Sequence, residues 1–151
     1  MKKQNLFYGL LALFIIFSSC SKDDDSNSNS IVGIWKPIKE IDVCSNGSEE
    51  KIDYDSCEQT GRFVFEKSGS FSKIDNYLNN NGDCELDESY NGTWTLSDGD
   101  LSLNFGGLSL PAAYFELSGN TLRIGQYDDS WSCQDGSSVS YYYTEYIKVT
   151  E

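Results

Sequence analysis

Carboxylates and cysteines are the side chains with which this chain of 151 residues could do chemistry, because it contains no histidine. Without histidine, a Ser-His-Asp or Cys-His nucleophile, imidazole acid–base catalysis and a histidine-ligated metal are excluded. Paired carboxylates can hydrolyse glycosides, but among 24 Asp and Glu some suitable pair always exists, so that pattern carries no information. No glycine-rich phosphate loop follows a strand and opens a helix. We therefore expect a protein that is not an enzyme and has no cofactor.

The acidic side chains also bear on partners and metals. A net charge of −13 repels phosphate backbones, so we expect no binding to nucleic acid. Residues 79–88 can be aligned with a calcium loop through Gly82, which places Asn79, Asn81 and Glu88 at ligand positions. Tyr77 then occupies the first ligand position, where an Asp belongs, and no helices flank the loop. A solvated hairpin tip is the better interpretation, and no metal site is predicted.

Residues 1–19 are organised like a secretory signal peptide. Lys2 and Lys3 precede an apolar run at residues 6–17. A helix of 12 residues is about 18 Å long, shorter than the ~30 Å hydrocarbon core of a bilayer. We therefore expect an export signal rather than a membrane span.

The residues that follow resemble the processing and sorting signals of bacterial lipoproteins. The run FSSC at residues 17–20 is similar to a lipobox that ends at Cys20. The run SKDDD at residues 21–25 resembles the acidic export signal of Bacteroidota surface lipoproteins. The resemblance implies lipidation of Cys20, a lipid anchor in the outer membrane and display on the cell exterior. The alternative is a cleaved soluble protein with an acidic linker. Residues 20–30 are polar and predict a flexible tether, which leaves 31–151 as one domain.

Four cysteines remain in the expected domain, and an even number in an exported chain indicates two disulfides. Three connectivities are possible. We favour Cys57 with Cys84 and Cys44 with Cys133, because the segment between Cys57 and Cys84 is patterned as a hairpin that brings its ends together. A zinc site made of the four thiolates is the alternative, although no pair has CxxC spacing.

Short alternating runs separated by turn residues predict an all-β domain. In residues 101–105, for example, Leu101, Leu103 and Phe105 alternate with polar residues. Eight strands are expected, at residues 34–41, 62–66, 71–76, 92–96, 101–105, 113–117, 121–127 and 141–149. Eight antiparallel strands joined in order close into an up-and-down barrel whose interior holds side chains or one small ligand. Pro37 removes a ladder donor and predicts a bulge or an early edge.

The order of several short motifs resembles the lipocalin-like domains of Bacteroidota lipoproteins over residues 31–150. Gly33-Ile34-Trp35 matches the lipocalin G-x-W, and the runs FVFEKSGSF (63–71), GTWTL (92–96), LRI (122–124) and YIKV (146–149) follow in the family's order. The resemblance implies that Trp35 plugs the closed end of the barrel under a basic side chain from a late strand. Arg123 or Lys148 could provide that side chain. The other lipocalin motifs are not recognisable.

Aromatic residues supply the candidate binding sites. Inward-facing residues that would line a pocket, if the barrel is hollow, are Phe63, Phe65, Trp94, Phe105 and Phe115. Trp131, in a polar loop beside Cys133, and Tyr142, in the tyrosine-rich last strand, are candidate surface contacts.

Two functions remain open from the sequence. The first is non-catalytic binding of a small apolar or amphipathic molecule inside the barrel. The alternative is an interaction module with a solid core, whose loops bind a glycan, a protein or an envelope partner. No oligomeric state is indicated.

Overall fold

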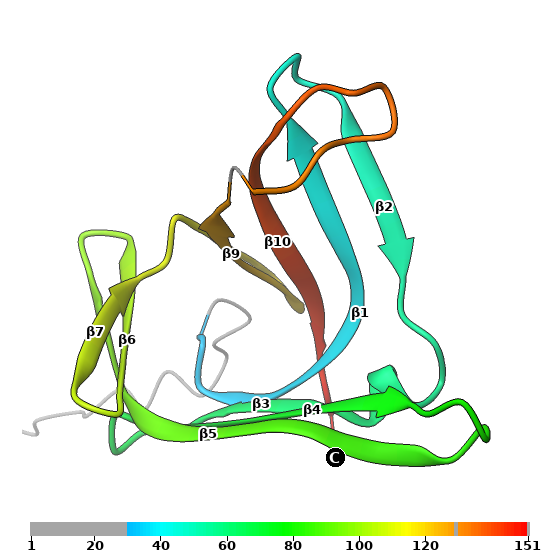
Figure 1. Ribbon diagram of the computed structural model, residues 1–151. Coiled ribbons are helices and arrows are strands. Elements are labelled where there is room, and N and C mark those ends of the chain that lie inside the picture. Colours follow the sequence, from blue (N-terminus) through cyan, green and yellow to red (C-terminus); the bar gives the residue numbers. More distant parts are fainter. Residues whose placement is uncertain (1–29, 129, 151) are drawn as a thin grey trace, which may run out of the picture.

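The computed structural model describes residues 30–128 and 130–150, which form an antiparallel sheet and one short 3-10 helix (Figure 1). The predicted signal peptide, Cys20 and most of the predicted tether lie outside the described residues. The elements are β1 (Gly33–Cys44), β2 (Glu49–Asp53), η1 (Glu58–Thr60), β3 (Arg62–Phe65), β4 (Ser70–Leu78), β5 (Cys84–Ser97), β6 (Asp100–Phe105), β7 (Leu108–Pro111), β8 (Tyr114–Ser118), β9 (Thr121–Tyr127) and β10 (Val139–Lys148). Within the described ranges, none of the helical structure is long and apolar enough to cross a bilayer.

The sheet is curled into a half-barrel. Its strand order is β7-β6-β5-β4-β3-β1-β10-β9-β8, and β2 pairs with β1 outside this path. The first and last strands, β1 and β10, pair along nearly their whole length, from Trp35 opposite Lys148 to Cys44 opposite Val139. β7 and β8 are the two ends of the strand order, although only Ala112 and Ala113 separate them in sequence. Because these two strands are not neighbours in the sheet, the barrel has a seam between them.

β1 changes partner along its length, which opens the barrel on one side. Residues Gly33–Trp35 pair with β3, whereas residues Lys39–Val43 pair with β2. Between the two stretches the register with β10 shifts at Pro37, as the missing N–H of this proline predicts. The wall of β1, β2 and β10 consequently diverges from the wall of β3, β4 and β5 (Figure 1).

The all-β antiparallel fold confirms the prediction, but the described residues form ten strands rather than eight. β2 was not predicted because its sequence, EEKID, is almost entirely charged and solvent-exposed, so it shows no alternation. β7 is four residues long and ends in Pro111. The first half of β5 is exposed on both faces, and for this reason the pattern revealed only its second half. Alternation detects a strand only where one of its faces is buried.

The core lies at the closed end of the half-barrel. It consists of the buried residues Ile31, Trp35, Phe63, Phe65, Phe71, Leu101, Leu122 and Tyr146. The ring of Phe63 contacts those of Phe65, Phe71 and Tyr146, with centroid distances of 4.3, 5.6 and 5.8 Å. Such close aromatic packing fills the closed end with side chains.

Both disulfides have the connectivity that the sequence favoured. Cys44–Cys133 joins the end of β1 to the loop between β9 and β10, and Cys57–Cys84 joins the start of η1 to the start of β5. All four sulfurs are therefore oxidised, so the alternative of a zinc site is wrong. Each disulfide fixes the position of a segment with few buried side chains, namely the β9–β10 loop in one case and the start of β5 in the other.

Candidate functional site

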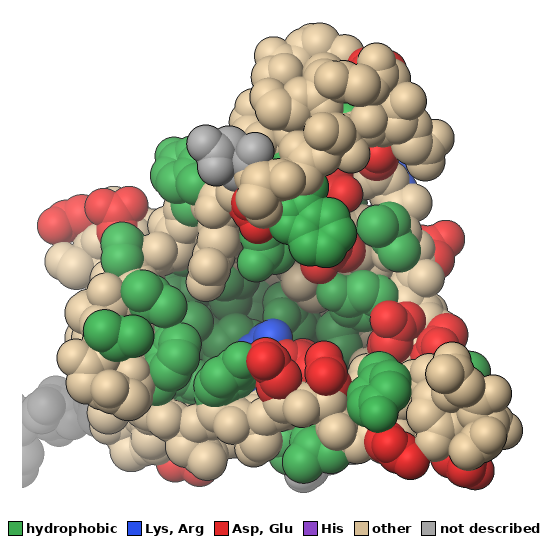
Figure 2. Space-filling model, in the orientation of Figure 1, with side chains coloured by type: hydrophobic (Ala, Val, Ile, Leu, Met, Phe, Trp, Pro, Cys, Tyr) green, Lys and Arg blue, Asp and Glu red, His purple; other side chains and the backbone are tan. Residues whose placement is uncertain are grey.

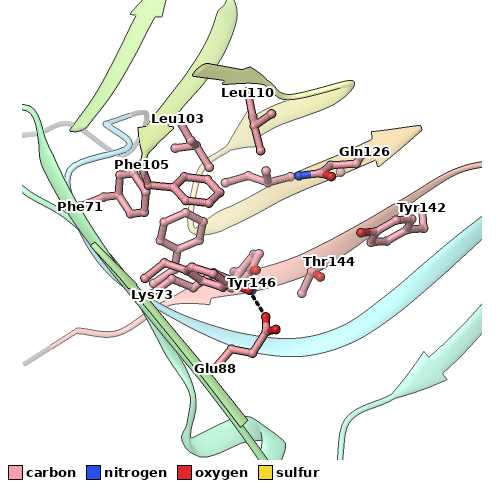
Figure 3. Close-up of a pocket in the computed structure, with 14 residues that line it drawn as sticks. Phe71, Lys73, Glu88, Leu103, Phe105, Leu110, Gln126, Tyr142, Thr144 and Tyr146 are labelled. Atoms are coloured by element: carbon pink, nitrogen blue, oxygen red, sulfur yellow. Dashed lines mark hydrogen bonds between the residues drawn. The ribbon is translucent and has the colours of Figure 1, made fainter. Parts of the chain in front are cut away.

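A cavity of about 340 Å³ opens inside the half-barrel, between β9 and β10 on one side and β3 to β7 on the other (Figure 2). Its inner end is apolar and is formed by Phe63, Phe71, Leu103, Phe105, Leu110 and Ile124. Its polar lining residues are Lys73, Glu88, Tyr90, Gln126, Tyr142, Thr144 and Tyr146; of these, Tyr90 and Tyr146 lie against the rings of Phe105 and Phe63. Figure 3 shows Phe71, Leu103, Phe105 and Leu110 grouped at one end, with Thr144 and Tyr142 at the other. The cavity thus has an apolar end and, opposite it, an end with the hydroxyl groups of Thr144 and Tyr142.

Strand alternation places these side chains. Every second residue of β10, namely Tyr142, Thr144 and Tyr146, faces the cavity. The residues between them, Tyr143 and Glu145, pack on the other face of the sheet, against Tyr114 and Arg123. Leu103 and Phe105 of β6 face the cavity by the same alternation, which the sequence had predicted for this strand.

Two of the five residues predicted to line a pocket do so, namely Phe63 and Phe105. Phe65 is 1% exposed and meets Trp94 edge to face at 5.7 Å, deeper in the closed end. Trp94 and Phe115 are partly buried against the core cluster. The prediction was therefore right about the face on which these three residues lie and wrong about their position along the barrel.

The two charged residues of the cavity lining, Lys73 and Glu88, each interact with a close neighbour. The ammonium of Lys73 forms an ion pair with Asp75, two residues along β4. The hydroxyl of Tyr90 donates a hydrogen bond to Glu88, drawn as a dashed line in Figure 3. Lys73 was not singled out from the sequence, although the alternation Phe71–Ser72–Lys73 places it on the same face as a core residue. Glu88 was considered there only as a ligand position of the calcium-loop alignment, not as part of a cavity.

Two further chambers, each of about 270 Å³, adjoin this cavity. One is lined by Glu40, Asp42, Ile52, Asp128, Trp131, Val139 and Tyr142 and is called the rim chamber below. The other lies over Pro37, Tyr54, Asp75 and Tyr77. Tyr142 lines all three spaces. The two predicted surface contacts, Trp131 and Tyr142, therefore lie together at the edge of the cavity.

Residues 79–83 form the tip of the hairpin between β4 and β5, as expected for a solvated turn. The side-chain oxygen of Asn79 accepts hydrogen bonds from the backbone N–H groups of Asn81 and Asp83, both at 2.9 Å. The Asn79 side chain therefore stabilises the turn through hydrogen bonds to the turn's own backbone.

The closed end has the plug that the G-x-W motif implied. Trp35 is fully buried, and its indole nitrogen donates a hydrogen bond of 2.7 Å to the carbonyl of Ile31. The ammonium of Lys148 lies 5.1 Å from the Trp35 ring centroid and donates to the carbonyl of Ser30 at 2.9 Å. Gly33 has a φ of 144°, and a Cβ there would lie 2.7 Å from Cε of Lys148. The glycine of the motif thus makes room for the lysine that covers the tryptophan.

A family model for the lipocalin-like domain matches residues 31–124, which is more than half of the chain. The chain belongs to the lipocalin-like domain family. No curated protein matches it. The matched segment begins at the plug and runs through most of β9, and the half-barrel has the all-β architecture that the family implies. A lipocalin-like fold is in general a binding fold, which agrees with the cavity described above.

Arg123 does not belong to the plug of this lipocalin-like barrel, contrary to one of the two sequence expectations. Its neighbours Leu122 and Ile124 face inward, so Arg123 projects from the other face of β9. There it binds Glu145 at 2.8 Å and Glu116 at 2.9 Å, and it lies 5.8 Å from the ring of Tyr143. Arg123 therefore joins β8, β9 and β10 on the outside of the barrel.

Glu145 is the buried centre of this outer network, and replacing it tests the network. Burial raises its pKa, but hydrogen bonds from Lys39 and Arg123 outweigh burial and hold the pKa below its ordinary value of 4.5. A lowered folded-state pKa contributes stability above the unfolded value, which is lost as the pH falls through the folded value. We expect Glu145→Gln to lower the free energy of unfolding by about 2 kcal/mol at pH 7, and by much less at pH 3.

Urea denaturation at the two pH values measures this difference. Glu49→Gln is the matched control, because Glu49 forms a solvent-exposed ion pair with Lys51; a loss below about 0.5 kcal/mol is expected there. An equal effect of Glu145→Gln at pH 7 and pH 3 would contradict a role for its charge.

Proposed function

We propose that this lipocalin-like barrel binds a small molecule with an apolar body and a polar head in the cavity between its walls. The observation that carries the proposal is the cavity itself: a volume of about 340 Å³ with phenylalanine and leucine side chains at one end, the hydroxyl groups of Thr144 and Tyr142 at the other, and the charged groups of Lys73 and Glu88 in its lining. Small-molecule sites in proteins span about 300–1,000 Å³ and are mostly apolar with a few polar groups. Each methylene group that a ligand buries there contributes about 0.8 kcal/mol.

A role in binding rather than catalysis is supported by the family and by the composition of the chain. The lipocalin-like fold is generally used for binding. The chain has no histidine for proton transfer near neutral pH. Lys73 and Glu88 are the charged groups of the cavity lining. Each interacts with a residue two positions away in its own strand: Lys73 with Asp75 in β4, and Glu88 with Tyr90 in β5. We propose that Lys73 and Glu88 orient the bound ligand.

The proposed location is the outer face of the outer membrane, with an anchor at Cys20. The sequence of the first 25 residues supports it, as argued above. The geometry of the first described residue adds an orientation. The Ser30 carbonyl is bound by Lys148 at the plugged end, so a tether that ends at residue 30 reaches the barrel at its closed end. The cavity would then open away from the membrane.

Palmitate labelling of the wild type and of Cys20→Ala tests the anchor, and labelling of both would contradict it.

Native mass spectrometry of protein purified gently from its host is the first test of the proposed function. A reproducible non-covalent adduct of a few hundred daltons, lost on denaturation, is expected. A bare protein mass would count against an occupied cavity and would favour the second candidate function below.

Filling the cavity should abolish binding without unfolding the protein. We expect Leu103→Trp to lower the affinity for the neutral probe N-phenyl-1-naphthylamine at least tenfold, because the larger ring occupies the apolar end. Leu86→Trp is the matched control, since Leu86 is 60% exposed and lies outside the three chambers. Leu110→Phe on the short strand β7 is the milder variant should Leu103→Trp not fold. Unchanged affinity in a folded Leu103→Trp protein would place the probe elsewhere.

Trp131 favours a second candidate function, the binding of a glycan or protein partner through loops. It is 69% exposed, and its loop is held by the Cys44–Cys133 disulfide and by a hydrogen bond of 3.0 Å from Val139 N–H to the Trp131 carbonyl. A rigid, exposed tryptophan is typical of contact surfaces. In this case Trp131→Ala would abolish capture of the partner at the cell surface, whereas Leu103→Trp would leave it unchanged.

A further inference from the structure

The rim chamber combines two aromatic rings with carboxylates from two directions. Glu40 and Asp42 enter it from β1, and Asp128 enters it from the segment that follows β9. Trp131 and Tyr142 provide the aromatic surfaces. The Cys44–Cys133 disulfide joins the end of β1 to the loop that carries Trp131, so these groups belong to segments that are linked covalently.

The carboxylates of this chamber are not paired with a cation. Among the described residues, the ion pairs involve Lys39, Lys51, Lys73 and Arg123, and none of these pairs includes Glu40, Asp42 or Asp128. No lysine or arginine is among the residues that line the chamber. The hydroxyl of Tyr54 is a long hydrogen-bond donor to Glu40, at 3.4 Å. The chamber therefore has an excess of negative charge beside aromatic rings.

The neighbours of these carboxylates make the excess charge unfavourable. Burial raises the pKa of Glu40, and repulsion by Asp42 and Glu58 raises it further, against smaller lowering effects of Tyr54 and Lys73. Burial also raises the pKa of Asp42, as do Glu50 and Asp128. Hydrogen bonds from Ser130 keep the pKa of Asp128 low, so this third carboxylate stays charged. A cation placed between the three would relieve the repulsion.

We propose that the rim chamber binds a substituted ammonium group, so that the ligand of the barrel is an amphipathic cation. The inference rests on the proposed function, because the apolar part of the same ligand would lie in the adjoining cavity. Trp131 and Tyr142 supply the aromatic faces that attract an ammonium, and Glu40, Asp42 and Asp128 supply its counter-charge. Tyr142 lines both spaces, so the ammonium group and the apolar part of one ligand would lie next to the same side chain.

The charge of the remaining lining favours a cation over an anion such as a fatty acid. Lys73 is the only basic residue that lines any of the three chambers in the described part of the chain, and it is already paired with Asp75. Asp87, Glu88 and Glu58 add further negative charge to the two other chambers. A carboxylate head group would have to compete with Asp75 for the single lysine.

Three probes with a chain of six carbons, counting the carboxyl carbon of hexanoate, test the inference: hexyltrimethylammonium, hexanoate and hexanol. Their affinities for the whole chain are measured by titration calorimetry at pH 7 and 0.15 M salt. The inference predicts that the ammonium probe binds at least tenfold more tightly than hexanoate. If hexanoate binds as tightly or more tightly, the inference is wrong but the proposed function stands. If none of the three binds, the proposed function fails as well.

Matched variants test whether the carboxylates of the rim chamber cause the preference for the ammonium probe. Glu40→Gln combined with Asp42→Asn is expected to weaken the ammonium probe at least tenfold and to change hexanol less than twofold. Asp98→Asn combined with Asp100→Asn removes the same charge at the turn between β5 and β6 and at the first residue of β6, outside the three chambers, and should leave both affinities unchanged. An equal loss in the two double variants would show general attraction to an acidic protein and would overturn the inference. Asp128→Asn, in an exposed loop, serves if the β1 variant does not fold.

Discussion

Replacing Trp35 by alanine is expected to lower the free energy of unfolding by about 4 kcal/mol, the usual cost of truncating a buried aromatic residue. Trp35 is the largest fully buried side chain, and it occupies the closed end where β1 begins. Its removal leaves a void between Ile31 and the aromatic cluster, loses the hydrogen bond to the Ile31 carbonyl, and leaves Lys148 without its ring. Chemical denaturation followed by circular dichroism measures the loss.

Lys148→Met separates the packing of the plug from its charge. The methionine keeps most of the aliphatic stem over Trp35 but loses the ammonium, so a cost of about 1 kcal/mol is expected. If Trp35→Ala cost no more than Lys148→Met, the tryptophan would not be the centre of the closed end. Both variants should still bind a ligand once folded, because neither residue lines the cavity.

The plug could be predicted because its residues are close in sequence and their types are restrictive. Gly33 precedes Trp35 by two residues, and its φ of 144° is a backbone conformation that residues with a Cβ rarely adopt. The choice between Arg123 and Lys148 depended on strand phase. The alternation Leu122–Arg123–Ile124 contains a signal, not used in the prediction, that Arg123 projects outward. The partner across the sheet, Glu145, becomes apparent only from the register of β9 with β10.

The cavity was less predictable than the plug for a physical reason. Alternation assigns each side chain to a face of the sheet, and it placed Phe63, Phe65 and Phe105 correctly. Whether an inward residue packs in the closed end or lines the cavity depends on where the walls diverge. That divergence follows from the change of partner of β1 from β3 to β2. Because β2 is charged and exposed, the sequence contained no pattern from which this change could be inferred.

The rim chamber was even less predictable from the sequence than the cavity. Trp131 and Tyr142 were selected as separate surface contacts, and the carboxylates of Glu40, Asp42 and Asp128 were not selected at all. Acidic residues are so frequent in this chain that their position in the sequence says little. The disulfide between Cys44 and Cys133 brings the loop to β1, and it was predicted, but the side chains that it would bring together were not.

Removing the Cys44–Cys133 disulfide, by Cys44→Ser combined with Cys133→Ser, is the second change for which a large effect is expected. The bridge closes a loop with a sequence separation of 89 residues, for which the chain-entropy model gives a loss of about 4.5 kcal/mol. The Cys57–Cys84 bridge has a separation of 27 residues, for which the same model gives about 3.5 kcal/mol. Chemical denaturation of the two double variants compares these values directly.

The two bridges should differ more clearly in binding than in stability. Cys44–Cys133 holds the loop of Trp131, but the loop also receives a hydrogen bond from Asn46 to Asp135 at 2.5 Å and gives one from Gln134 to Glu50 at 2.6 Å. Its loss should therefore weaken hexyltrimethylammonium several-fold rather than abolish binding. The Cys57–Cys84 variant should bind the same probe as the wild type does, because that bridge lies at η1 and β5, away from Trp131. Equal weakening in both variants would mean that the disulfides act on binding only through global stability, and that the rim chamber does not depend on the position of its loop.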